Sequence, residues 1–179
     1  RTLPRVISIV GAGGKTSTMY DLAEELAAKG ARILITTSTH IAKPEQYRTE
    51  VIPKLADLDA ASYAGALRNP GGFILAAGKQ VEDPDNAWKL AMPEDLGEER
   101  VMKRLLSQFD VILIEADGAK RLPLKVPSDT EPVLIPQTGL IIACVGLTAG
   151  GKQFGDSCFR FASNGGWLHK EAQDVIGAE

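Results

Sequence analysis

A glycine-rich turn between an apolar run and an amphipathic segment constrains this chain most. Residues 6–10 (VISIV) are typical of a buried strand, and the turn follows them directly. Glycines allow a tight turn that aims successive main-chain N–H groups at one anion, and a helix beginning there adds the positive end of its dipole. The turn is therefore predicted to bind phosphate through the following residues. They are Gly11, Ala12, Gly13, Gly14, Lys15, Thr16 and Ser17.

The turn departs from two standard nucleotide-binding patterns. In G-x-x-x-x-G-K-[ST], counting back from Gly14 places the first glycine at Ile9, so the loop here is shorter. In the dinucleotide pattern G-x-G-x-x-G, the third glycine falls on Thr16. A turn that only joins a strand to a helix is the alternative. Glycines followed at once by Lys15 and Thr16 favour nucleotide binding, in which the lysine reaches the terminal phosphates and the threonine hydroxyl binds Mg²⁺.

The remaining pattern predicts an α/β fold with three α/β/α layers and a mostly parallel sheet. Apolar spacing predicts a helix over residues 15–29, and a strand over 31–35 completes a right-handed βαβ unit. Further elements are expected as short strands at 51–52 and 73–77, a buried strand within 139–147, and helices over 55–67 and 93–108. Residues 80–92 are either an excursion over the site or a small hairpin. Residues 1–152 are expected to form the nucleotide-binding domain, and 153–179 a divergent or truncated tail of it.

A second constellation follows the apolar run 111–114. Glu115 and Asp117 come at its carboxyl end, two residues apart and so on the same side, beside Gly118. Acids at the end of a buried strand are common, but a magnesium-nucleotide site uses such carboxylates to hold the metal and align water. Together with the Lys15 loop, they are candidate catalytic and metal-binding residues.

Hydroxyls and cations supply further candidates. Thr37 ends the second predicted strand and is a candidate metal ligand, because ligands gather at the carboxyl ends of parallel strands. Polar loop residues that merely cap strand ends are the alternative. Candidate substrate or phosphate contacts come from this loop and from the basic run after Asp117, which could equally be solvated surface. They are Thr39, His40, Lys120, Arg121 and Lys125.

Composition restricts the class of protein. A net charge of −3 over 179 residues gives no basic surface for nucleic acid or an acidic membrane. No apolar run has the length of a membrane helix, and no signal peptide is recognisable at the start. Cys144 and Cys158 form no C-x-x-C pair, and Cys144 is expected to be buried in a strand. A cytoplasmic setting is therefore expected.

The motifs around residues 10–17, 36–40, 115–125 and 145–152 together resemble the YqeC family of selenium cofactor biosynthesis proteins. The resemblance implies a P-loop NTPase-like fold and an accessory role in maturing selenium-dependent molybdenum hydroxylases, with maturation proteins as partners. The shortened loop is also similar to that of Mur-type ligases, which bind ATP. Thr148 stands where the family pattern has an acidic residue, and family members usually continue past the end of this chain.

Three functional hypotheses remain open. The first is an enzyme that hydrolyses ATP or GTP with Mg²⁺, with a Mur-like ATP-dependent ligase as a variant. The second is a non-catalytic module whose bound nucleotide gates docking to a partner. A dinucleotide oxidoreductase is disfavoured by Thr16 and by the lack of an acid after the second strand. No Asn-Lys-x-Asp run is present, so the choice between adenine and guanine stays open.

Overall fold

A computed structural model describes residues 4–59, 61, 72–82 and 88–177. Its centre is a six-stranded sheet in the order β10-β1-β8-β2-β5-β4, in which every pairing is parallel. The predicted α/β class and parallel sheet are thus confirmed. The strands are β1 (Val6–Gly11), β2 (Ile33–Thr37), β4 (Thr49–Val51), β5 (Phe73–Ala77), β8 (Val111–Glu115) and β10 (Leu140–Cys144).

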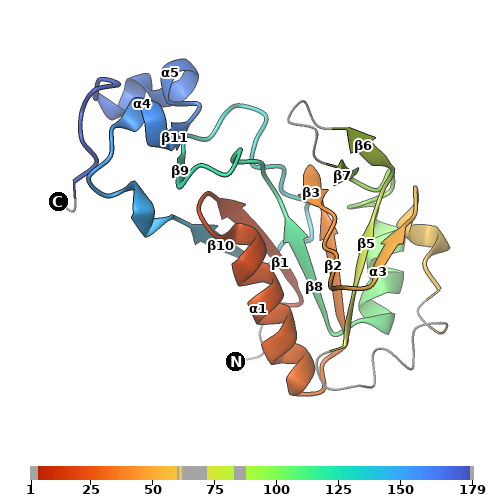
Figure 1. The fold of residues 1–179 in the computed structure, drawn as a ribbon. Helices are drawn as coiled ribbons and strands as arrows, with labels where there is room; N and C mark the ends of the chain where they lie inside the picture. The colour runs from red at the N-terminus through yellow and green to blue at the C-terminus, as the bar shows by residue number, and fades with distance from the viewer. Residues whose placement is uncertain (1–3, 60, 62–71, 83–87, 178–179) are drawn as a thin grey trace.

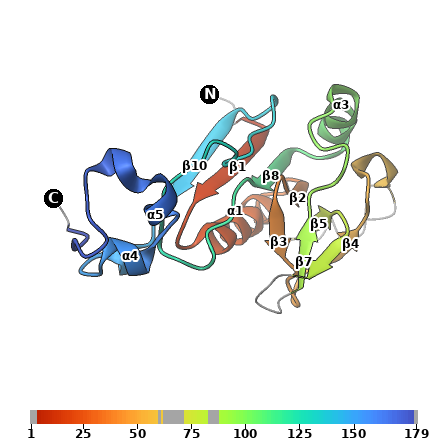
Figure 2. The same cartoon turned by 90° about the horizontal axis from the view of Figure 1, so that it is seen from above.

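Two helices cover opposite faces of this sheet and complete the predicted α/β/α layers (Figures 1 and 2). Helix α1 (Lys15–Ala28) buries Met19 and Ala23 against one face. Helix α3 (Glu99–Gln108) buries Met102 and Leu105 against the other. Because successive side chains of a strand alternate between faces, the inner strands are buried on both sides.

Helix α3 begins later than the sequence predicts. Residues 94–97 form turns instead, because the buried Asp95 carboxylate accepts the main-chain N–H groups of Leu55 and Ala56. The helix predicted over 55–67 is represented by the short 3₁₀ helix η1 (Leu55–Asp57), and most of its remainder lies outside the described residues.

Residues 80–92 contribute two strands of a small antiparallel sheet, in agreement with the hairpin alternative. This sheet has the order β3-β7-β6, with β3 (His40–Ala42), β6 (Gln80–Glu82) and β7 (Trp88–Ala91). The main-chain N–H of Met92 donates to the carbonyl of Thr39, so the sheet is tied to the end of β2. It stands above the carboxyl ends of the central strands (Figure 1).

The C-terminal segment forms a small body beside β10 and the turn after β1 (Figure 1). Strand β9 (Leu124–Lys125) pairs in parallel with β11 (Cys158–Phe159), and Val126, Cys158 and Phe161 form its own small core. Its helical elements are short: η3 (Leu147–Ala149), α4 (Phe154–Ser157), α5 (Phe161–Asn164) and η4 (Gly165–Leu168).

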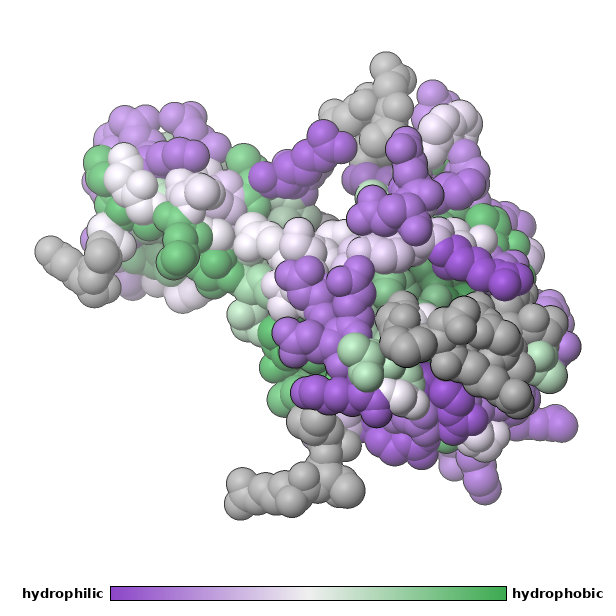
Figure 3. All heavy atoms as spheres, turned by 60° about the horizontal axis from the view of Figure 1, so that its bottom comes forward, coloured by the Kyte–Doolittle hydropathy of each residue, from purple (hydrophilic) through white to green (hydrophobic). Residues whose placement is uncertain are grey.

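The strand expected to be buried within 139–147 lies instead at the edge of the sheet. Ile141 is 49% exposed and Val145 64%, and Cys144 is only partly buried. The reason is that β10 pairs with β1 on one side, and no other described strand lies on its outer side. Figure 3 shows apolar residues on the C-terminal body at the left, where Leu147 and Trp167 are also exposed. No described helix is both long and apolar enough to span a membrane.

Candidate functional site

The turn after β1 presents main-chain N–H groups at the start of α1. The N–H of Thr18 is the first to bond within the helix, to the carbonyl of Gly14. The preceding N–H groups, from Gly14 to Ser17, have no intrahelical acceptor, as at every helix start. Those of Gly11 and Ala12 are already used, by Asp117 Oδ2 at 3.1 Å and by the Cys144 carbonyl at 2.9 Å. The main-chain N–H groups available to an anion are therefore those in the second half of the turn.

Close backbone contacts explain the glycines of the first half. A Cβ on Gly11 would lie 2.2 Å from the Cys144 carbonyl oxygen, and one on Gly13 would lie 2.4 Å from Gly146 Cα. Both glycines have positive φ values, of 92° and 66°. The turn is thus packed against the backbone after β10 and against the carbonyl of Pro123.

The strand order places the two predicted acids beside this turn. Because β8 pairs with β1, its carboxyl end lies next to the start of α1. The Thr16 hydroxyl donates to Glu115 Oε2 at 3.2 Å, and Lys15 Nζ lies 3.5 Å from Asp117 Oδ1. Residues separated by about a hundred positions in the chain therefore share one buried site.

Glu115 is the most perturbed acid of this site. Burial raises its pKa to about 7, although the charge of Lys15 and the Thr16 hydrogen bond act in the opposite direction. Two charges have smaller effects on this pKa: Asp117 raises it, and Lys89, from the small antiparallel sheet, lowers it. A carboxyl group with a pKa near neutral pH can either accept or donate a proton under physiological conditions.

This raised pKa predicts a pH dependence of stability for the metal-free protein. A carboxyl group whose folded pKa lies above its unfolded value loses stability as pH rises between the two values, here from about 4.5 to 7. By pH 8, the ionisation of Glu115 is expected to have lowered the free energy of unfolding by about 3 kcal/mol. We expect Glu115→Gln, which cannot ionise, to lose less stability over this range than the parent protein. Urea denaturation of both proteins at pH 5, 6, 7 and 8 measures the difference, and parallel curves would contradict it.

The hydroxyls at the end of β2 and just after it are only partly available to a ligand. The Thr37 hydroxyl donates to the Glu115 carbonyl at 2.9 Å and accepts the N–H of Thr39, so it fixes the end of β2 against β8. By contrast, the buried hydroxyl oxygens of Thr36 and Thr39 have no hydrogen-bond partner in the structure. His40 is exposed at the start of β3.

The three predicted cations have different surroundings. Lys120 and Arg121 are exposed and both have positive φ values, of 44° and 61°. The Lys125 side chain is only 2% exposed, and its ammonium contacts Asp117 Oδ2 at 3.0 Å and Glu131 Oε2 at 2.8 Å. It also donates to the Gly118 carbonyl at 2.7 Å.

Sequence reasoning missed two charged residues of this network. Arg160 Nη1 lies 2.9 Å from Glu131 Oε2 and extends the network to β11. Burial alone would raise the pKa of Glu131, but Lys125 and Arg160 outweigh it and hold that pKa below its usual range. Neither residue belongs to a recognisable motif. The proline-rich loop that contains Glu131 and the unpatterned segment that contains Arg160 gave no signal.

The donor set fits a hard divalent cation. Mg²⁺ prefers oxygen ligands, and two carboxylates and one hydroxyl, from Glu115, Asp117 and Thr16, converge beside the helix start. Asp117 Oδ1 is buried without a hydrogen-bond partner, which is the condition expected of a ligand oxygen. The same position suits the phosphates of a nucleotide, because the free N–H groups of the turn adjoin it.

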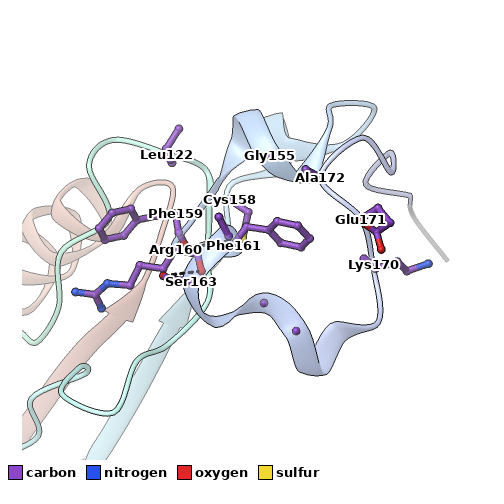
Figure 4. A pocket seen from close by; sticks show the side chains of 13 residues that line it. Leu122, Gly155, Cys158, Phe159, Arg160, Phe161, Ser163, Lys170, Glu171 and Ala172 are labelled. Atoms are coloured by element: carbon purple, nitrogen blue, oxygen red, sulfur yellow. Dashed lines mark hydrogen bonds between the residues drawn. The ribbon is translucent and has the colours of Figure 1, made fainter.

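A cavity of about 570 Å³ lies in the C-terminal body (Figure 4). Cys158, Phe161 and Ala172 contribute to its walls, and Phe159 and Arg160 line its side nearer the sheet. Leu122, one residue from the Pro123 that contacts Gly13, also lines it. None of the lining residues belongs to the turn or to the acidic pair.

Comparison with known proteins identifies the family. The model of the YqeC protein family matches residues 7–162. This chain belongs to the YqeC family. It is 37% identical over 161 residues to the uncharacterized protein YqeC of Escherichia coli (strain K12), covering 89% of this chain and 59% of that relative. It thus spans about three fifths of the length of that YqeC protein. No solved structure matches. The family match includes the turn, both acids, Lys125, Glu131 and Arg160.

Proposed function

We propose that this YqeC protein binds a magnesium nucleoside triphosphate and hydrolyses it. The observation that carries this proposal is the shared position of the helix start and the acidic pair, with Thr16 bonded to Glu115 and Lys15 beside Asp117. Free N–H groups and an ammonium for phosphate, next to buried oxygen ligands for a cation, are the parts that phosphoryl transfer requires.

The roles follow from the surroundings of each residue. Lys15, whose ammonium now donates to the Gly11 carbonyl at 2.8 Å, would turn to the terminal phosphates and neutralise charge there. Thr16, Glu115 and Asp117 would hold Mg²⁺. The cation would neutralise negative charge on the phosphate oxygens. Glu115 is the candidate to orient the attacking water and accept its proton, because its buried carboxylate lies beside the start of α1, where it accepts the Thr16 hydroxyl.

A second proposal concerns the biological role of the protein and rests on the sequence resemblance alone. The resemblance to selenium cofactor proteins implies a role in maturing selenium-dependent molybdenum hydroxylases, with maturation proteins as partners. The site bears on nucleotide binding alone, so this role is a separate proposal from hydrolysis. Phosphate release measured with and without candidate maturation proteins tests it. A partner that changes the rate supports the accessory role, whereas unchanged rates and the absence of a complex contradict it.

Lys15→Ala tests the nucleotide site itself. Loss of a charged contact to phosphate is worth about 1.5–3 kcal/mol, so we expect affinity for Mg-ATP or Mg-GTP to fall about ten- to a hundredfold. Titration calorimetry with both nucleotides measures this. Lys29→Ala, at the exposed end of the same helix, is the matched control and leaves affinity unchanged. Equal affinity of Lys15→Ala and the parent protein would refute the proposed site.

A further inference from the structure

Charges of alternating sign run from the phosphate-binding turn to the C-terminal body. In order they are Lys15, Asp117, Lys125, Glu131 and Arg160. Successive nitrogen–oxygen distances are 3.5, 3.0, 2.8 and 2.9 Å. The first three side chains are 6%, 2% and 2% exposed, so water screens their interactions little.

Asp117 is shared unequally between its two lysines. Lys125 Nζ is 3.0 Å from Oδ2, whereas Lys15 Nζ is 3.5 Å from Oδ1 and donates its hydrogen bond to the Gly11 carbonyl instead. Oδ1 has no hydrogen-bond partner, and Oδ2 also accepts the N–H of Gly11. Asp117 is therefore held mainly by Lys125 and the backbone, and only loosely by Lys15.

This inequality matters because Lys15 must leave Asp117 in order to reach phosphate. A buried carboxylate that loses its sole counter-charge is strongly disfavoured. If Lys15 were the only cation beside Asp117, it would therefore stay paired with Asp117. We propose that Lys125 is the positioning residue that releases Lys15 for phosphate, because it keeps Asp117 neutralised after Lys15 departs. This inference rests on the proposed nucleotide site and concerns the regulation of its lysine.

The outer part of the network supports the same role. Glu131 would compete with Asp117 for the charge of Lys125, but Arg160 pairs with Glu131 and offsets part of its charge. The Arg160 guanidinium also lies 4.9 Å from the centre of the Phe159 ring on β11. Arg160, from the C-terminal body, thereby offsets the charge of Glu131 and leaves more of the charge of Lys125 for Asp117, so the release of Lys15 depends on that body being folded.

The test measures phosphate binding without a divalent metal, so that the role of Asp117 as a metal ligand does not contribute. Titrations of ATP, GTP and tripolyphosphate in EDTA compare the parent protein with Lys125→Met, Asp117→Asn and the double variant. We expect Lys125→Met to bind about tenfold or more weakly, because Lys15 becomes the main counter-ion of Asp117. Asp117→Asn binds at least as tightly as the parent, and the double variant regains parental affinity. Lys103→Met, exposed on α3, is the control.

The outcomes separate this inference from the proposed function. A parent protein that binds none of the three ligands, with or without Mg²⁺, refutes the nucleotide site itself. Parental binding by Lys125→Met, or a double variant that stays weak while its thermal unfolding is cooperative, refutes only the role of Lys125. If Lys125→Met does not fold, Asp117→Asn decides, because weaker binding of tripolyphosphate by that variant would overturn the inference.

Discussion

Glu115→Gln is expected to lower metal-dependent nucleotide hydrolysis at least about a hundredfold, the usual effect of removing a general base. Glutamine keeps an oxygen that can accept the Thr16 hydrogen bond, so the local packing is preserved. It removes both the negative charge that would hold Mg²⁺ and the group that would accept a proton from water. Phosphate release under saturating Mg-ATP and Mg-GTP measures the loss.

The stability of this variant makes the result interpretable. Because the carboxylate of Glu115 is buried, Glu115→Gln is expected to be at least as stable as the parent above pH 7, so lost turnover would not reflect unfolding. Glu99→Gln, at the exposed start of α3, serves as the matched control. Undiminished hydrolysis by Glu115→Gln would show that Glu115 does not act as the proton acceptor in the reaction. An inactive parent that binds Mg-nucleotide would favour the non-catalytic, nucleotide-gated module instead.

Gly11→Ala is expected to destabilise the fold by several kcal/mol, about 3 or more. The new Cβ would lie 2.2 Å from the Cys144 carbonyl oxygen, which is part of the main chain and cannot rotate away. Relief would require β1 and β10 to separate at their paired ends, where Gly11 is opposite Cys144. Urea denaturation followed by circular dichroism measures the change.

Gly14→Ala separates this clash from backbone strain. Gly14 also has a positive φ, of 111°, but a Cβ there would meet nothing within 4 Å. Its substitution is therefore expected to cost only the strain, about 1–3 kcal/mol. Equal destabilisation by the two variants would show that φ alone requires glycine at position 11, and that the contact with Cys144 is unimportant.

The sequence predicted the elements whose signals are local. The apolar run before Gly11 and the regular spacing after Lys15 match β1 and α1 closely, because burial on a sheet and on a helix face impose different periods. The same reasoning placed Glu115 and Asp117 at the end of a buried strand. The structure brings them to the turn because β1 and β8 are neighbours, which no local pattern specifies.

The parts that the sequence did not predict depend on contacts between residues far apart in the chain. The run at 139–147 is apolar enough for a central strand, yet β10 is at an edge, because strand order depends on pairing and not on hydropathy. The sequence left open whether Lys125 contacts phosphate or lies on solvated surface, whereas the structure buries it between the Asp117 and Glu131 carboxylates. The roles of Glu131 and Arg160 in this network follow only from their positions in the folded structure.

The position of β1 between β8 and β10 affects how the chain folds during its synthesis. Strand β1 is synthesised before both strands that pair with it, and the main-chain N–H of Gly11 donates to a carboxylate 106 residues downstream. The proposed nucleotide site would therefore be complete only at a late stage of synthesis. A nucleotide that binds this proposed site would favour the completed topology by mass action.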